Sequence, residues 1–267
     1  MALNNPAFSR DAAFSSRGGI AVANQVSNQQ LNDMYSREST PDSGDVMTVE
    51  DTIAKTVGAF ALLLIGAALS WVLAPSMPFL WIGAGIIGFV LALVNIFKKQ
   101  PSGALVLAYA AVEGLFVGGI SRFYETAYGG VVTQAVIATI VVVGVTLALF
   151  ASGKIRASKK ATKVFLIAMV GYVVFSLVNL VLMATGVTQS TQGLRSYEIF
   201  GIPLGVVIGV AVVIMAAYSL VLDFDFIQKG VNNGAPRVFG WKGTFGIMVT
   251  VIWLYLELLR MFSLMRD

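Results

Sequence analysis

The sequence of 267 residues contains no cysteine and no histidine, and it is poor in charge. Without these two residue types it cannot form disulfides, zinc sites built on Cys or His, haem ligation by His, or Ser-His and Cys-His catalytic pairs. Only 12% of its residues are charged, compared with about 25% in an ordinary soluble domain, while 57% are hydrophobic. So few charges cannot cover a water-facing surface, and the composition therefore indicates an integral membrane protein.

Seven apolar segments are each close to the roughly 20 residues that a helix needs to cross a bilayer. They lie at 53–73, 79–97, 101–121, 131–150, 164–184, 202–222 and 244–261. The runs are continuously apolar and show no alternation of period two, which excludes a β-barrel. The sequence predicts an all-α bundle of seven transmembrane helices over residues 53–267. Residues 1–52 are rich in Asn, Ser and Gln and are predicted to form a flexible polar cytoplasmic tail.

Lysine and arginine are distributed unevenly between the two sides of these segments. Four lie on one side, at Arg122, Arg195, Arg260 and Arg266. Twelve lie on the other, at Arg37, Lys55, Lys98, Lys99, Lys154, Arg156, Lys159, Lys160, Lys163, Lys229, Arg237 and Lys242. The positive-inside rule then predicts a cytoplasmic N-terminus and an external C-terminus. The block at 154–163 could be read as a nucleic-acid or phosphoinositide patch, but an anchor attracted to anionic lipid is the favoured interpretation.

Four acidic residues fall inside or at the ends of the apolar segments, where a charge costs about 2.5–3.5 kcal/mol. Glu113 is near mid-membrane, either as a cavity-facing carboxyl that binds a cation or proton or as a protonated side chain bonded to another helix. Asp223 and Asp225 close the sixth segment, about 200° apart on a helix, so that one can face the bundle. Glu257 has Arg260 at i+3 and could form a local salt bridge.

Two further patterns bear on packing and on chemistry. Glycines recur at intervals of four at Gly114 and Gly118 and at Gly201, Gly205 and Gly209, which predicts close approach between helices. No Gly-x-Gly-Asp motif, phosphate-binding loop or histidine base is present, so we expect the protein not to be an enzyme.

Three ordered motifs resemble those of the Bax inhibitor-1 (transmembrane BAX inhibitor motif) family. They are residues 109–121 (YAAVEGLFVGGIS), 223–228 (DFDFIQ) and 253–262 (WLYLELLRMF). The resemblance covers roughly residues 50–265, leaves the tail outside, and is greatest to bacterial members. It implies a seven-helix bundle with the last helix at the centre. It also implies a Ca²⁺ leak gated by protonation of two acidic residues on the last two helices; eukaryotic members modulate cell death.

The resemblance places Asp225 at the first acidic position, although Phe226 and Ile227 replace the family's Thr-Gln. Two registers compete for the second position. Aligning residues 254–257 with the family's Leu-Tyr-Leu-Asp selects Glu257, the favoured choice, whereas aligning residues 258–260 with its terminal Leu-Leu-Arg selects Thr250.

The sequence thus predicts a calcium or proton-linked cation leak in a bacterial cytoplasmic membrane. Glu113, Asp225 and Glu257 would bind the ion or proton, with Asp223 and Arg260 in support. Ca²⁺ would be the transported ion, with Asp225 and Glu257 among its ligands, and no resident cofactor or nucleic acid is expected. The rival interpretations are a non-transporting adaptor that regulates a partner such as a quality-control protease, and a secondary transporter for a small organic solute.

The orientation is directly testable. A reporter inserted in the 154–163 loop should read cytoplasmic, because this loop carries the excess of lysine and arginine. A reporter fused after Asp267 should read external, because an odd number of crossings places the two ends of the chain on opposite sides of the membrane. Finding both reporters on one side would contradict seven crossings.

Overall fold

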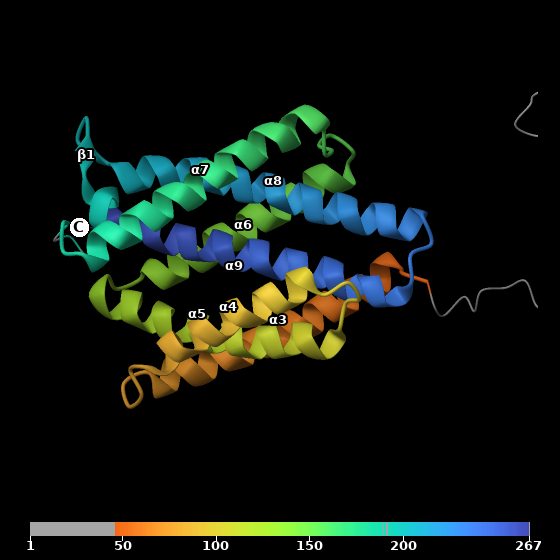
Figure 1. The fold of residues 1–267 in the computed structure, drawn as a ribbon, viewed down its shortest axis with the longest axis horizontal. Helices are drawn as coiled ribbons and strands as arrows, with labels where there is room; N and C mark the ends of the chain where they lie inside the picture. The colour runs from red at the N-terminus through yellow and green to blue at the C-terminus, as the bar shows by residue number, and fades with distance from the viewer. Residues whose placement is uncertain (1–45, 189, 191, 267) are drawn as a thin grey trace, which may run out of the picture. The chain divides into compact units, whose positions relative to one another are not determined.

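The computed structural model describes residues 46–188, 190 and 192–266, so the first 45 residues of the predicted tail lie outside the described residues. The long helices are α3 (Val49–Leu73), α4 (Leu80–Phe97), α5 (Gly103–Ala127), α6 (Val131–Ala151), α7 (Lys159–Ala184), α8 (Leu204–Asn232) and α9 (Gly240–Leu264) (Figure 1). Short elements join them: the 3₁₀ helices η2 (Gly193–Ser196) and η3 (Arg237–Phe239), and a hairpin of β1 (Glu198–Ile199) and β2 (Ile202–Pro203). Seven helices in this part of the chain are long and apolar enough to cross a membrane, which confirms the predicted helical bundle.

Several helices extend further into polar sequence than predicted. The first begins at Val49, where the Thr48 hydroxyl caps it by accepting a hydrogen bond from the backbone N–H of Asp51 at 3.1 Å. Met47 is fully buried, so residues 46–52, assigned to the tail from sequence, belong with the bundle. At the other end of the chain, α8 continues ten residues past position 222 to Asn232. Asp223 and Asp225 therefore lie within a helix and not at its end.

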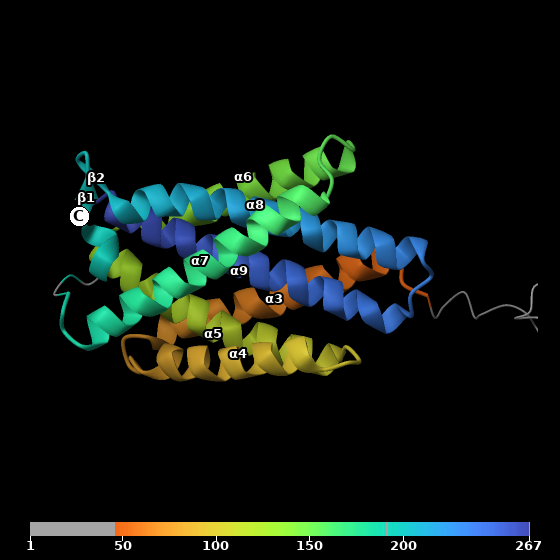
Figure 2. The same cartoon turned by 45° about the horizontal axis from the view of Figure 1, so that its top comes forward.

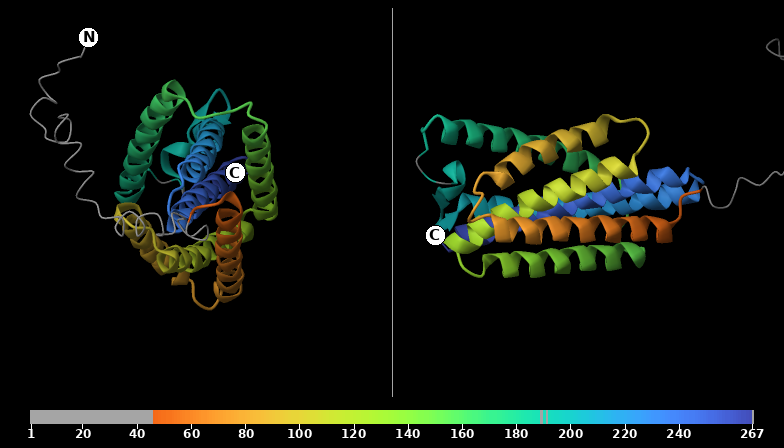
Figure 3. Two further views of the ribbon diagram at one scale, coloured as in Figure 1. Left: turned by 90° about the vertical axis from the view of Figure 1, so that its right-hand side faces the viewer. Right: turned by 90° about the horizontal axis from the view of Figure 1, so that it is seen from below.

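The last helix occupies the centre of the bundle, as the resemblance implies. Figures 2 and 3 show α9 running between α8 on one side and the α3–α5 group on the other. Within its most apolar stretch 56% of the residues are buried, compared with 6% for α7. Its inward side chains include Met248, Leu254 and Leu259. Groups that α9 carries are consequently screened from lipid, whereas α7 is peripheral.

Glycine allows α3 and α5 to pack backbone against backbone. A Cβ at Gly66 would lie 2.7 Å from the Ala111 carbonyl oxygen, and those at Gly114 and Gly118 would meet the carbonyls of Leu63 and Ala67. These contacts agree with the close packing predicted for this pair of glycines on α5.

The glycines of the sixth segment divide into two groups. Gly205 and Gly209 pack against Leu264 and Met261 of α9. Gly201 lies outside the helix, in the hairpin turn, where its φ of 75° is readily adopted only by glycine. Close packing therefore applies to two of the three predicted positions.

Replacing Gly118 by alanine should lower the free energy of unfolding by about 1–3 kcal/mol, because the new Cβ would overlap a carbonyl that cannot rotate away. Thermal unfolding of the purified protein measures the effect. Gly171→Ala on α7 is the matched control, since nothing lies within 4 Å of a Cβ there. Equal melting temperatures for the two variants would contradict the packing described for α3 and α5.

Candidate functional site: buried acids of the bundle

Glu113 lies near the middle of α5, about 15 Å from its start at Gly103, and is 9% exposed. Its Oε2 occupies the space that a side chain at position 88 of α4 would fill, so Gly88 makes room for the carboxylate. Among the described residues no hydrogen bond or ion pair is formed by this side chain. Glu113 is therefore a buried acid without compensation, held between α4 and α5.

Asp223 faces α9 and contacts the residue that the second register selected. Its Oδ2 accepts a hydrogen bond from Thr250 Oγ1 at 2.7 Å, and Thr250 Oγ1 lies 3.2 Å from Ser219 Oγ. Its Oδ1 lies 2.6 Å from the position that a Cβ would take at Gly246. No lysine or arginine in the described part of the chain pairs with Asp223. A carboxylate and two hydroxyls thus form a short polar chain between two apolar helices.

Asp225 points elsewhere. It pairs with Lys229 at 2.5 Å, one turn further along α8, and its side chain is 19% exposed. The resemblance placed Asp225 at the family's first acidic position, whereas in the structure it is Asp223 that faces α9. The reason is helical phase: Asp223 continues the buried stripe of Ala216, Leu220 and Ile227 at intervals of three and four, and Asp225 does not. That stripe was the signal in the sequence that distinguishes the two.

Glu257 is 1% exposed and fully compensated. Its carboxylate accepts hydrogen bonds from Arg195 Nη1 at 2.6 Å, from Arg260 Nη1 at 2.6 Å and from the Tyr172 hydroxyl at 2.8 Å. The i+3 pair with Arg260 is the contact anticipated from sequence. Arg195 is itself buried and lies 62 positions earlier in the chain, beyond the reach of any local pattern.

The structure does not bring Asp225 and Glu257 together. Thr250 is the α9 residue that meets Asp223, and Glu257 lies seven residues further along, about 10 Å along the axis. Asp225 and Glu257 therefore do not form a pair between the last two helices in this structure. Within the described ranges no three acidic side chains gather where they could hold a metal ion.

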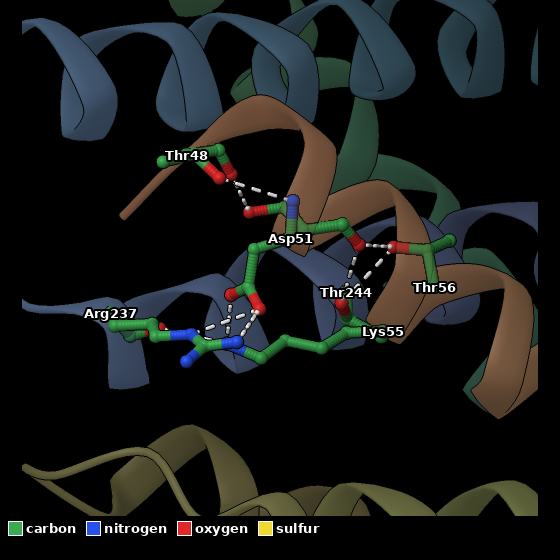
Figure 4. Close-up of polar contacts among 7 residues, drawn as sticks. Thr48, Asp51, Lys55, Thr56, Arg237 and Thr244 are labelled. Carbon is green, nitrogen blue, oxygen red and sulfur yellow. Dashed lines mark hydrogen bonds and ion pairs between the residues drawn. The ribbon is translucent and has the colours of Figure 1, made fainter. Parts of the chain in front are cut away.

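A charged clasp joins the beginning of α3 to the approach to α9 (Figure 4). Asp51 accepts hydrogen bonds from Arg237 Nε at 3.0 Å and Nη2 at 2.6 Å, and Lys55 Nζ lies 2.5 Å from its other oxygen. One turn further in, the hydroxyls of Thr56 and Thr244 are 3.0 Å apart. The sequence placed Asp51 within the polar tail. Its partner Arg237 is 186 positions away, so no local pattern reveals the contact.

A family model described as Bax inhibitor 1 like matches residues 5–267. The chain belongs to this family. The match includes most of the N-terminal region, so the expectation that the tail lies outside the resemblance is wrong. A search of curated proteins found no match. Family membership agrees with the seven helices that are long and apolar enough to cross a membrane.

Glu257→Gln should destabilise this Bax inhibitor 1-like protein by about 3–5 kcal/mol, because it leaves the buried Arg195 and the half-buried Arg260 without a counter-charge. Asp225→Asn is the matched control: it breaks an i,i+4 pair whose lysine is 68% exposed, which is worth about 0–1 kcal/mol. Thermal unfolding compares the two. A Glu257→Gln protein as stable as Asp225→Asn would mean that the arginine contacts contribute nothing to the fold.

Proposed function

We propose that this family member is a cation leak pathway, with Ca²⁺ as its main ion, and that protonation of Asp223 regulates it. We further propose that it is not an enzyme and that it resides in a bacterial cytoplasmic membrane with its N-terminus in the cytoplasm. The observation that carries the proposal is the contrast among the acids that face other helices: Glu113 and Glu257 are buried and Asp223 is half-buried. Glu257 has two arginine partners, whereas Asp223 and Glu113 have none in the described part of the chain.

An uncompensated carboxylate is costly inside a membrane protein, and it lowers its energy by binding a proton or a cation. At Asp223 the carboxylate, the Thr250 hydroxyl and the Ser219 hydroxyl offer oxygen atoms, which are the ligands that Ca²⁺ prefers. Ca²⁺ takes six to eight such ligands, more than these three side chains provide. Water would have to complete the shell, which suits an ion in transit better than a resident one.

The acids divide into two roles under this proposal. Asp223 lies between α8 and α9 with Gly246 beside it, a position from which its charge acts on both helices. Glu113 lies near mid-membrane against Gly88 and would attract a cation partway along its path. Glu257, placed among the ion-binding residues from sequence, is better explained as a structural acid that holds α7 and the η2 loop on α9.

Asp223→Asn should abolish the pH dependence of cation flux. Asparagine fixes a neutral group in nearly the same volume, so flux at every pH should equal the wild-type value at the acid end of the range. The measurement is Ca²⁺ flux into liposomes containing the purified protein between pH 5 and 8. Glu113→Gln should lower flux several-fold at every pH, because it removes a ligand and leaves the switch intact.

Asp225→Asn is again the control, two positions away on the same helix but already paired with Lys229. It should keep the wild-type pH profile. If Asp225→Asn removes the pH dependence and Asp223→Asn does not, the assignment made from sequence is right. If all three variants conduct like the wild type, the buried acids are structural and the adaptor function replaces transport.

A further inference from the structure

A long apolar groove runs along the bundle between α3 and α6. Figure 3 (right) shows the two helices side by side, and the groove between their side chains has a volume of about 1110 Å³. Its lips are exposed branched side chains at Ile53, Val57, Leu64, Val136, Ile140 and Leu147. It reaches from Val49 to Trp71 on α3, about 33 Å, which matches the ~30 Å hydrocarbon core. We refer to it as the α3–α6 groove.

The hydroxyl groups that line the α3–α6 groove already have partners. The Ser121 and Tyr255 hydroxyls are 2.6 Å apart, and Thr139 donates to the Ala135 carbonyl at 2.7 Å. Thr52 and Thr56 likewise donate to carbonyls one turn earlier, at 2.8 Å each. These hydroxyl groups already form hydrogen bonds within the protein, so the surface of the groove favours an aliphatic occupant.

One mouth of the groove carries positive charge. Phe150 and Ala151, at the end of α6, line the groove there. Arg156 folds back over this end: its Nη1 donates to the Phe150 carbonyl at 2.7 Å, and its guanidinium carbon lies 4.2 Å from the centre of the Phe150 ring. Lys154 is exposed two positions earlier. The planar guanidinium keeps N–H groups for an anion such as a phosphate.

Across the groove, the first turn of α3 carries two acidic residues, Glu50 and Asp51, fewer than the five basic residues at 154–163. Asp51, at the start of α3, is already bound by Lys55 and Arg237. The next basic residues, Lys159, Lys160 and Lys163, add to the positive charge at the beginning of α7. An aliphatic channel with a cationic mouth is complementary to a molecule that has long hydrocarbon chains and one anionic end.

We propose that the α3–α6 groove is a binding site for an anionic phospholipid from the leaflet on the 154–163 side. Its acyl chains lie against α3 and α6, and its phosphate is bound by Arg156 and Lys154. This site is separate from the buried acids, and it stands whether or not the protein conducts cations.

Headgroup recognition is tested by native mass spectrometry of the full-length, delipidated protein with an equal mixture of phosphatidylglycerol and phosphatidylcholine. The wild type should retain phosphatidylglycerol preferentially. Replacing Lys154 and Arg156 by glutamine should reduce that preference roughly tenfold or more, since each charge-assisted bond can contribute a factor of this size. Replacing Lys98 and Lys99 by glutamine removes the same charge from another loop that does not line the groove, and it should leave the preference unchanged.

Occupancy of the groove itself is tested by filling it. Gly144 lines the groove, and nothing lies within 4 Å of the position that a Cβ would take there. Gly144→Leu therefore adds a side chain without a clash and should expel the retained lipid. Gly171→Leu on α7 has the same open surroundings away from the groove and should keep the lipid. Thermal unfolding of both variants checks that they are folded.

Three results would overturn the proposal. The first is equal retention of the two lipids by the wild type, and the second is retention of phosphatidylglycerol by Gly144→Leu. The third is a wild-type dimer that Gly144→Leu dissociates, which would make a second copy of the chain the occupant.

Discussion

The carboxylate of Glu257, held between Arg195 and Arg260, joins α9 to η2 and α7. Each of these charges would be costly alone in a low-dielectric interior, and each is tolerated because the other two are present. The three groups come from α9 and from the η2 loop, and the Tyr172 hydroxyl adds α7 to the same network. Removing one member therefore affects three elements at once.

This network matters most for α7. Helices in a membrane gain little from apolar burial against one another, so polar contacts and close packing determine which surfaces meet. Only 6% of the apolar stretch of α7 is buried, yet one face of the helix makes polar contacts at intervals of three and four residues: Tyr172, Ser176 and Asn179. The Asn179 side chain bonds the η2 backbone in both directions, accepting from Leu194 N–H at 2.7 Å and donating to the Gln192 carbonyl at 3.3 Å. A polar seam thus holds α7 where apolar burial does not.

The number of crossings was predictable because a bilayer demands long apolar runs, and such runs are visible in sequence. The ends were less predictable, since α8 remains helical through polar residues supported by pairs such as Asp225 with Lys229. Within the site, Glu113 and the Glu257–Arg260 pair were visible because their burial and spacing are local. The role of Arg195 was not visible, because this residue reaches Glu257 from a segment 62 positions earlier in the chain. The choice between Asp223 and Asp225 depends on which face of α8 meets α9, and the motif alone does not contain that information.

Ion pairs hold the central helix near its start and near its end, and neutral hydroxyl groups contact it between these levels. Near its start the Asp51 carboxylate binds Arg237 and Lys55, and near its end Glu257 binds two arginines. Between these levels Asp223 meets α9 through the single hydrogen bond from Thr250. A change in the charge of Asp223 therefore alters the contact between α8 and α9 at a point where few other polar contacts oppose it.

The two ways in which helices are joined here also respond differently to displacement. On the α3–α5 side, Gly66 and Gly118 bring backbone against backbone, so sliding one helix past the other drives atoms into overlap. On the α7 side, contact depends on a few hydroxyl, amide and guanidinium groups whose side chains can rotate and exchange partners. A rearrangement that preserves backbone packing must consequently leave α3 and α5 together, whereas α7 can shift by exchanging side-chain partners. The charged groups around Glu257 then hold α7 on the bundle and also oppose its displacement.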